Sequence, residues 1–145
     1  MSLSLALRYV HVLAAVTWLG GMLFIALVLV PVARRLPDGA LRTRLVGDLG
    51  TRFRTVGWIA IGLLVATGLG NLWLRPELLW TARFQGKAGL VILAVVLSAF
   101  HDFVLGPRAG RAGADPAARL RASWVARVNV LVVLAIVALG LALRG

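Results

Sequence analysis

The chain has 145 residues, 61% of them apolar, with a mean hydropathy of +0.94 and no cysteine. A soluble domain of this composition would expose large apolar faces to water, so the composition indicates an integral membrane protein. The lack of cysteine excludes disulfides, iron–sulfur clusters and thiol nucleophiles. The net charge of +11 lies mostly between the apolar runs, which indicates membrane topology and no nucleic-acid partner.

Four apolar stretches are long enough to cross a bilayer core, which needs roughly 20 residues per helix. They cover about residues 5–30, 56–74, 86–105 and 123–143. The sequence therefore predicts an all-α fold, an integral membrane four-helix bundle that forms a single transmembrane domain over residues 1–145. The four helices form two successive hairpins. In each, an apolar helix ends at proline and arginine residues and a basic loop leads to a second helix, which predicts two hairpins in parallel repeat.

Positive charge is divided unequally between the two ends of this bundle. Eleven arginines lie in the connections within the hairpins: Arg34, Arg35, Arg42, Arg44, Arg52, Arg54, Arg108, Arg111, Arg119, Arg121 and Arg127. The opposite end holds five basic residues: Arg8, Arg75, Arg83, Lys87 and Arg144. The positive-inside rule then predicts a multi-pass protein of the cell membrane with the basic loops in the cytoplasm and both termini outside.

Two segments between the apolar stretches have their own expected conformations. Residues 40–54 place leucines at helical spacing among arginines, which indicates either an amphipathic helix on the membrane surface or an inward extension of the second helix. Residues 106–121 are rich in glycine, alanine, proline and arginine, so we expect a mobile loop that becomes helical near Pro116.

Ionisable groups at membrane depth are costly and therefore mark candidate sites. At about 1.5 Å of rise per residue, His11, Asn71 and Lys87 of the first three helices lie at similar levels near the outer face and can meet in one pocket. Trp18 and Met22 follow His11 along one stripe of the first helix. The competing interpretation is a histidine that only forms a hydrogen bond to a neighbouring helix.

A second polar layer is expected near the inner face. His101 and Asp102 end the third helix, Asn129 enters the fourth helix at about the same level, and Arg127 lies just outside it. The competing interpretation is that His101 and Asp102 have no functional role and only join neighbouring helices or contact the headgroup layer.

One face of the third helix carries Lys87, Ala94, Ser98 and His101, and we expect this face to look into the bundle. Most tryptophans of the chain lie near the ends of the apolar stretches and are expected as interface anchors: Trp58, Trp73, Trp80 and Trp124.

Neutral imidazole on a bundle helix suits the axial ligation of a b-type haem, with small residues making room and an arginine near the propionates. His11, with Arg8 outside it, fits this plan, and the second position at the iron is taken by Lys87, by a water or by nothing. Asn71 and Trp18 complete the expected cofactor-binding set.

The two histidines cannot clamp one haem, because the levels of His11 and His101 differ by roughly 18 Å. Copper is the competing hypothesis, with His11, His101 and Met22 as its ligands. Cu(I) prefers thiolate and thioether ligands, and this chain has no cysteine and only two methionines.

Residues 11–21 (HVLAAVTWLGG) resemble the first helix of the CopD-like membrane proteins, which carry a histidine followed by a W-x-G-G step. Residues 54–71, with an A-T-G step, and the Gly86-Lys87 pair resemble the next two helices. The CopD-like resemblance implies copper uptake or resistance. The pattern is also similar to HemJ-type protoporphyrinogen oxidases, which bind haem b and whose important histidine and lysine would fall on His11 and Lys87.

The leading hypothesis is a CopD-like protein that binds haem b near the outer face for electron transfer or small-molecule redox chemistry, including that of a haem-dependent membrane oxidoreductase. The alternatives are a copper uptake or resistance protein and a cofactor-free accessory subunit of a larger membrane complex. The expected partners are the lipid bilayer and a redox partner or larger complex, with a homo-oligomer left open.

Overall fold

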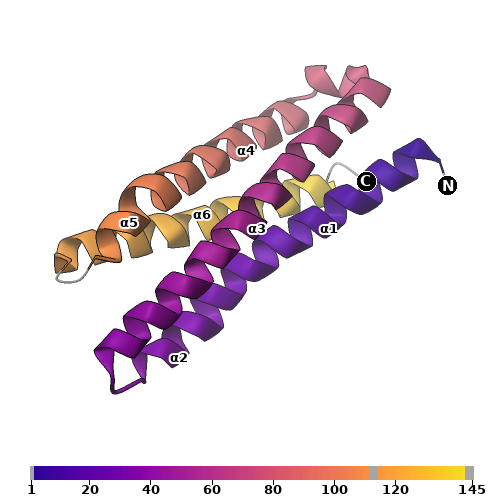
Figure 1. Cartoon of the computed structure of the whole chain (residues 1–145). Coiled ribbons are helices and arrows are strands. Elements are labelled where there is room, and N and C mark those ends of the chain that lie inside the picture. The colour runs from indigo at the N-terminus through magenta and orange to yellow at the C-terminus, as the bar shows by residue number, and fades with distance from the viewer. Residues whose placement is uncertain (1, 112–113, 143–145) are drawn as a thin grey trace.

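A computed structural model describes residues 2–111 and 114–142, and every regular element in that part of the chain is helical. Four spans in it are long and apolar enough to cross a membrane: Leu3–Arg34, Gly39–Leu74, Ala82–Ala109 and Pro116–Leu141. Figure 1 shows these spans as four long rods arranged in two hairpins. The predicted all-α membrane bundle is confirmed.

The first hairpin begins with α1 (Leu3–Phe24), which continues through a π-helical turn (Ile25–Leu29) into α2 (Val30–Arg34). The return helix, α3 (Gly39–Leu74), packs against α1 along its length. Asp38 caps the start of α3, since its carboxylate accepts backbone N–H bonds of 2.7 and 3.2 Å from the first turn.

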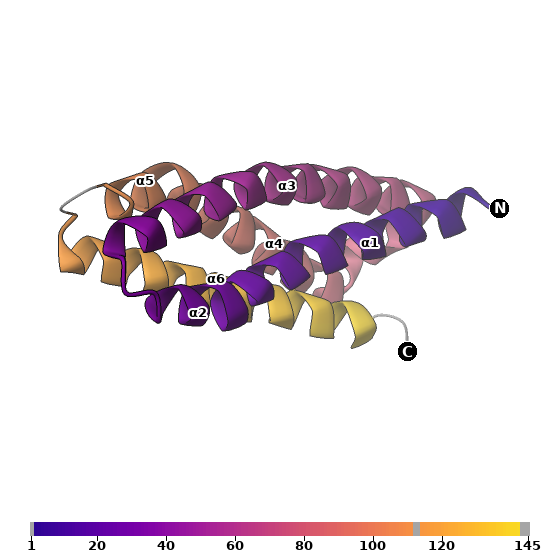
Figure 2. The ribbon, with the colours of Figure 1, turned by 60° about the horizontal axis from the view of Figure 1, so that its bottom comes forward.

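The second hairpin follows a 3₁₀ turn (Pro76–Trp80). Its first span consists of α4 (Ala82–Phe100), a π-helical turn (His101–Leu105) and α5 (Gly106–Ala109), and its second span is α6 (Pro116–Ala142). Figure 2 shows the α2–α3 and α5–α6 connections at one end of the bundle. We call this the basic end and the opposite end, where α1 begins and α6 ends, the terminal end.

All four helices extend further toward the basic end than predicted. α3 runs without a break from Gly39, so residues 40–54 extend the second helix and the surface-helix alternative is wrong. Residues 106–109 are also helical and α6 starts at Pro116, so the predicted loop at 106–121 was too long, although the helical start at Pro116 is confirmed. Alanine, leucine and arginine are strong helix formers, so the helices continue beyond the ends of the apolar stretches.

The two hairpins share one register. An offset of 76 residues relates the π-helical turn Ile25–Leu29 to His101–Leu105, and Pro31 to Pro107. Proline lacks the N–H that an α-helix needs, and each π-helical turn ends two residues before a proline. The predicted parallel repeat therefore has a defined alignment, and the same offset relates His11 to Lys87.

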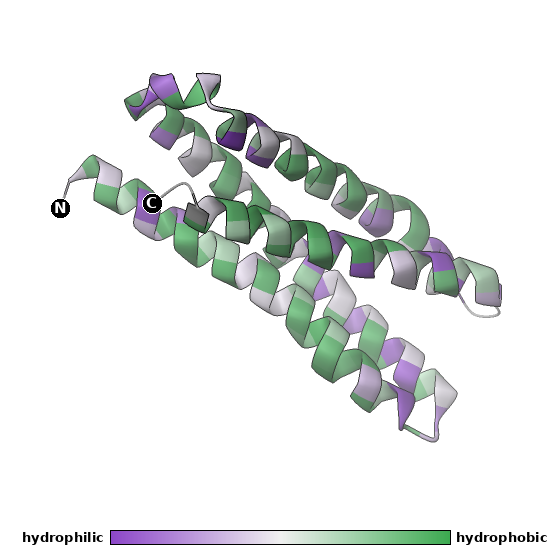
Figure 3. Cartoon of the chain, turned by 180° about the vertical axis from the view of Figure 1, so that it is seen from behind, coloured by the Kyte–Doolittle hydropathy of each residue, from purple (hydrophilic) through white to green (hydrophobic). Residues whose placement is uncertain are grey.

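The core contains side chains from all four spans: Ala14, Trp18, Ala60, Ile61, Ala94 and Val133. Most of these are small, which lets membrane helices approach closely. Ala94 and Ser98 are buried, as predicted for the inward face of the third helix. Figure 3 shows hydrophobic residues along the middle of the spans and hydrophilic ones toward their ends.

Candidate functional site

The polar cluster at the terminal end is centred on Thr67 of α3. Its hydroxyl oxygen lies 2.8 Å from Nδ1 of His11 on α1 and 2.6 Å from the backbone carbonyl of Leu63. Asn71 donates from its side-chain amide to the backbone carbonyl of Thr67 at 2.8 Å. Thr67 is only 6% exposed, so these bonds lie between the helices and not at the surface.

The hydrogen bond to Thr67 fixes the orientation of the His11 ring. A threonine hydroxyl has one hydrogen, and Leu63 offers it a carbonyl acceptor at 2.6 Å. With the hydroxyl donating to Leu63, it accepts from His11 and Nδ1 of the imidazole carries the hydrogen. In the neutral ring the lone pair is on Nε2. Gly68 lies beside the ring, since a Cβ there would be 3.8 Å from Cε1 of His11.

The other residues predicted for this site are placed around it. Lys87 lies against Gly140 of α6, where a Cβ would be 3.4 Å from Nζ. Arg8 is exposed, one turn outside His11. His11 and Asn71 therefore meet through Thr67, while Lys87 has the corresponding position in the second hairpin. Their joint role as a cofactor site stays a prediction.

The W-x-G-G step has a packing role. Trp18 is 6% exposed and packs beside Gly57 of α3, where a Cβ would be 3.7 Å from Cδ1 of the indole. The ring of Phe53 lies directly on the backbone of Gly21, where any Cβ would overlap it. Among the described residues, no atom of another helix lies within 4 Å of a Cβ built at Gly20. Only the second glycine of the step is therefore required by contact between α1 and α3.

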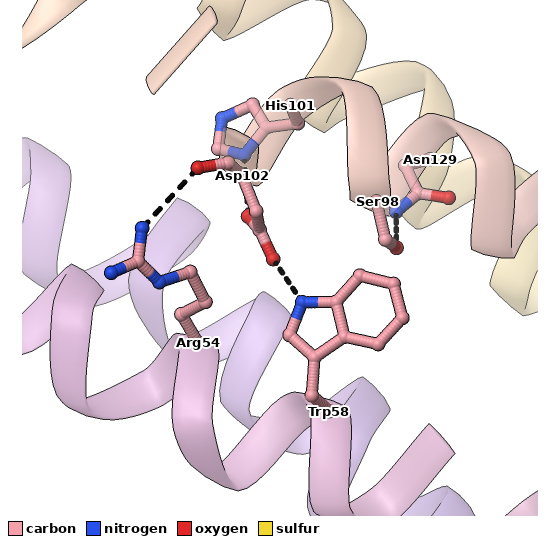
Figure 4. A network of polar contacts seen from close by, with 6 residues as sticks. All are labelled: Arg54, Trp58, Ser98, His101, Asp102 and Asn129. Atoms are coloured by element: carbon pink, nitrogen blue, oxygen red, sulfur yellow. Dashed lines mark hydrogen bonds and ion pairs between the residues drawn. The ribbon is translucent and has the colours of Figure 1, made fainter. Parts of the chain in front are cut away.

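A second polar cluster joins the hairpins at the basic end, and Figure 4 shows its residues. The carboxylate of Asp102 lies 3.0 Å from Nδ1 of His101 through Oδ1, and its Oδ2 accepts from Nε1 of Trp58 on α3 at 3.0 Å. Arg54 donates to the backbone carbonyl of Asp102 at 3.3 Å, and its guanidinium lies 5.9 Å from the centre of the Phe103 ring. The side chains of Asp102 and Phe103 thus meet Trp58 and Arg54 of α3, while His101 bonds to Asp102.

The π-helical turn explains the bond from Arg54. The N–H of Gly106 binds the carbonyl of His101, and Pro107, the next donor position along the turn, has no N–H. The carbonyl of Asp102 is therefore left without a helical donor, and the guanidinium of Arg54 supplies one. A buried carbonyl without a partner would be destabilising.

The amide of Asn129 on α6 donates to the hydroxyl of Ser98 on α4 at 2.8 Å. Asn129 is 4% exposed, and its Oδ1 has no hydrogen-bond partner among the residues that the structure describes. The pair therefore joins α4 to α6 within the second hairpin.

The structure shows the contacts within the inner layer predicted from the sequence. Asp102 bonds to His101 beside it and to Trp58 of α3, Asn129 pairs with Ser98, and the guanidinium of Arg127 lies 5.5 Å from the centre of the Trp124 ring. A joint role of these residues as one site stays a prediction. The sequence reasoning placed Thr67 one turn below Asn71 but did not pair it with His11, and it did not identify Arg54 or Trp58 as partners of Asp102.

The predicted copper ligands do not converge on one ion. His11 and Met22 are eleven residues apart on the continuous helix α1, which separates them by about 16 Å. His101 lies at the basic end of the bundle, far from His11. Within residues 2–111 and 114–142, no group of three or more histidine, aspartate or glutamate side chains is placed to hold a metal ion.

Comparison with known proteins adds two findings. Residues 48–143 match the family model described as Copper resistance protein D, CopD. A protein of Aquifex aeolicus (strain VF5), described as "Uncharacterized protein", is 31% identical over 142 residues, which cover 94% of this chain and 92% of that protein. No solved structure matches the chain significantly.

Proposed function

This chain belongs to the CopD family of membrane proteins, and we propose that it binds haem b through His11 at the terminal end of the bundle. The arginine bias favours placing this end outside the cell. The haem would serve electron transfer or small-molecule redox chemistry. The observation that carries the proposal is the hydrogen bond of 2.8 Å between His11 and Thr67, which fixes the imidazole.

The residues around His11 fit a ligand of this kind. The bond to Thr67 holds the ring in one orientation. With Nδ1 as the donor in that bond, the lone pair is on Nε2, which is then available to a metal. A glycine beside the ring leaves the approach to it without a side chain. When bound, haem b would supply one-electron chemistry at its iron.

Two further basic residues support the same site. Lys87 stands at the position equivalent to His11 in the second hairpin, so it lies at the corresponding level and against a glycine of the following helix. Arg8 is exposed one turn further out, where its guanidinium can pair with a carboxylate such as a propionate. In this proposal His11 holds the metal, while Lys87 and Arg8 provide positive charge beside it.

The test is an ultraviolet-visible spectrum, oxidised and dithionite-reduced, of protein purified in mild detergent after expression with ample haem. A Soret band with reduced α and β bands is expected for the wild type, and His11→Ala should abolish it while His101→Ala keeps it. A featureless wild-type spectrum, or an unchanged one for His11→Ala, would overturn the proposal.

Replacing Thr67 tests the positioning of the imidazole separately from ligation. Thr67→Val keeps the shape of the side chain but removes the acceptor for Nδ1, so we expect about 10- to 100-fold weaker haem affinity. Thr67→Ser keeps the hydroxyl and should restore affinity, which a purely steric role would not predict. Haem titration of the apoprotein, followed at the Soret band, measures both variants.

The alternative is a copper-handling protein, which the printed description of the family favours. His11, Met22 and His101 would then each bind copper weakly, at three separate positions. Metal analysis of the purified protein separates the two hypotheses, since the copper alternative predicts stoichiometric copper and no Soret band.

A further inference from the structure

Two apolar grooves follow one another along the first hairpin, between α1 and α3, and we call them together the seam. The groove near the basic end has about 200 Å³ and is lined by Gly21, Phe24, Ile25, Leu29, Leu49, Arg52, Phe53 and Val56. The groove toward the terminal end has about 250 Å³ and is lined by Val10, Leu13, Ala14, Thr17, Val56, Ile59, Ala60 and Leu63. Val56 lines both grooves, so they are neighbours.

Two backbone features border the groove near the basic end. Gly21 has no side chain, and the ring of Phe53 lies directly over its backbone. The π-helical turn Ile25–Leu29 inserts an extra residue into the first span next to the groove.

The only charged side chain lining either groove is Arg52, at the basic end of the seam. Arg52 is exposed and forms no ion pair or hydrogen bond with the described residues. The acid one turn before it, Asp48, pairs instead with Arg44 at 3.8 Å. The guanidinium of Arg52 is therefore free to bind a ligand beside an apolar groove of a membrane-spanning hairpin.

We propose that this seam is a binding site for an anionic phospholipid, with an acyl chain in the groove and the phosphate on Arg52. A guanidinium binds phosphate oxygens in bidentate fashion, which fits this end of the seam. Lipid tails are as apolar as leucine, so the groove contributes shape and packing and no net hydrophobic transfer. The preference among headgroups therefore comes from Arg52.

Native mass spectrometry of the full chain in detergent tests this, with phosphatidylglycerol titrated against phosphatidylcholine of identical acyl chains. We expect roughly fivefold preference for the first bound phosphatidylglycerol, the effect of one basic residue near the headgroups. Arg52→Gln should remove the preference. Arg42→Gln, an exposed arginine of the same helix with the same loss of charge, should keep it.

A second pair of variants tests the groove itself. Leu49→Trp fills the groove near Arg52 and should lower the affinity for the first bound molecule of both lipids severalfold. Leu41→Trp adds the same side chain to an exposed position two turns away and should not. Equal losses for Arg52→Gln and Arg42→Gln would mean a diffuse basic surface and would overturn the proposal, as would unchanged lipid binding by Leu49→Trp.

Discussion

The contact between Gly21 and Phe53 gives the sharpest test of how the first hairpin packs. In Gly21→Ala the new methyl group overlaps the aromatic ring, so the ring must move or α1 and α3 must separate. The neighbouring Gly20→Ala is the matched control, because no atom of another helix among the described residues lies within 4 Å of its Cβ. Both changes gain the same helix propensity, up to about 1 kcal/mol, so this term cancels between them.

The remaining difference is the overpacking of α1 against α3, which costs about 1–3 kcal/mol in well-packed sites. We therefore expect the free energy of unfolding of Gly21→Ala to lie below that of Gly20→Ala by about that amount. The assay is unfolding in mixed micelles by titration with sodium dodecyl sulfate, followed by far-ultraviolet circular dichroism.

A double variant identifies the ring as the cause. Phe53→Leu shortens the side chain over Gly21, so Gly21→Ala combined with Phe53→Leu should show a favourable coupling of about 0.5–3 kcal/mol. If Gly21→Ala were as stable as Gly20→Ala, or if the double variant showed no coupling, the packing role of the second glycine would be refuted.

Two further predictions concern the polar bonds that Asp102 and Ser98 of the second hairpin form, and the same titration measures the stability of each variant. Trp58→Phe removes the N–H that binds Asp102 and should lower the free energy of unfolding by about 1–3 kcal/mol. Trp73→Phe, at an 80% exposed position, should leave it nearly unchanged. Similar losses for both variants would contradict the bond. Ser98→Ala leaves the amide of Asn129 without its acceptor and should lower the free energy of unfolding by about 1–3 kcal/mol. Adding Asn129→Leu removes the unpaired amide and should restore stability. A double variant that is less stable than Ser98→Ala would argue against this.

The number and type of helices could be predicted from the sequence because apolar stretches of bilayer length leave few other solutions. The helix ends could not, because the apolar stretch ends where the bilayer core ends, whereas the helix ends where capping and propensity allow. α3 shows the difference: its apolar part starts near residue 56, but its cap is Asp38. The arginine-rich residues between them contain no proline, and their leucines and arginines favour helix enough to carry it through Gly47 and Gly50.

The site was predicted in part for a similar reason. Depth along a helix follows from counting residues, and this placed Asn71 and Thr67 near His11; in the structure Thr67 bonds to both, while their joint role as a cofactor site stays a prediction. The residue that joins them, Thr67, donates its hydroxyl within its own helix, and such a threonine carries no signal of its own in sequence. Trp58 gave a misleading signal, because a tryptophan near a helix end fits both an interface anchor and a donor to Asp102.

The repeat separates what the fold requires from what only one hairpin has. Both hairpins form the same π-helical turn before a proline, but the first copy is wholly apolar (Ile25–Leu29) and the second begins with His101 and Asp102. The turn therefore does not need these polar residues, and the bonds of Asp102 with Trp58 and Arg54 of α3 are specific to the second hairpin. At the terminal end the equivalent positions carry His11 and Lys87, two basic groups of different chemistry. The two copies thus share one scaffold, and the positions at which they differ in chemistry are those that a functional study of this chain should change first.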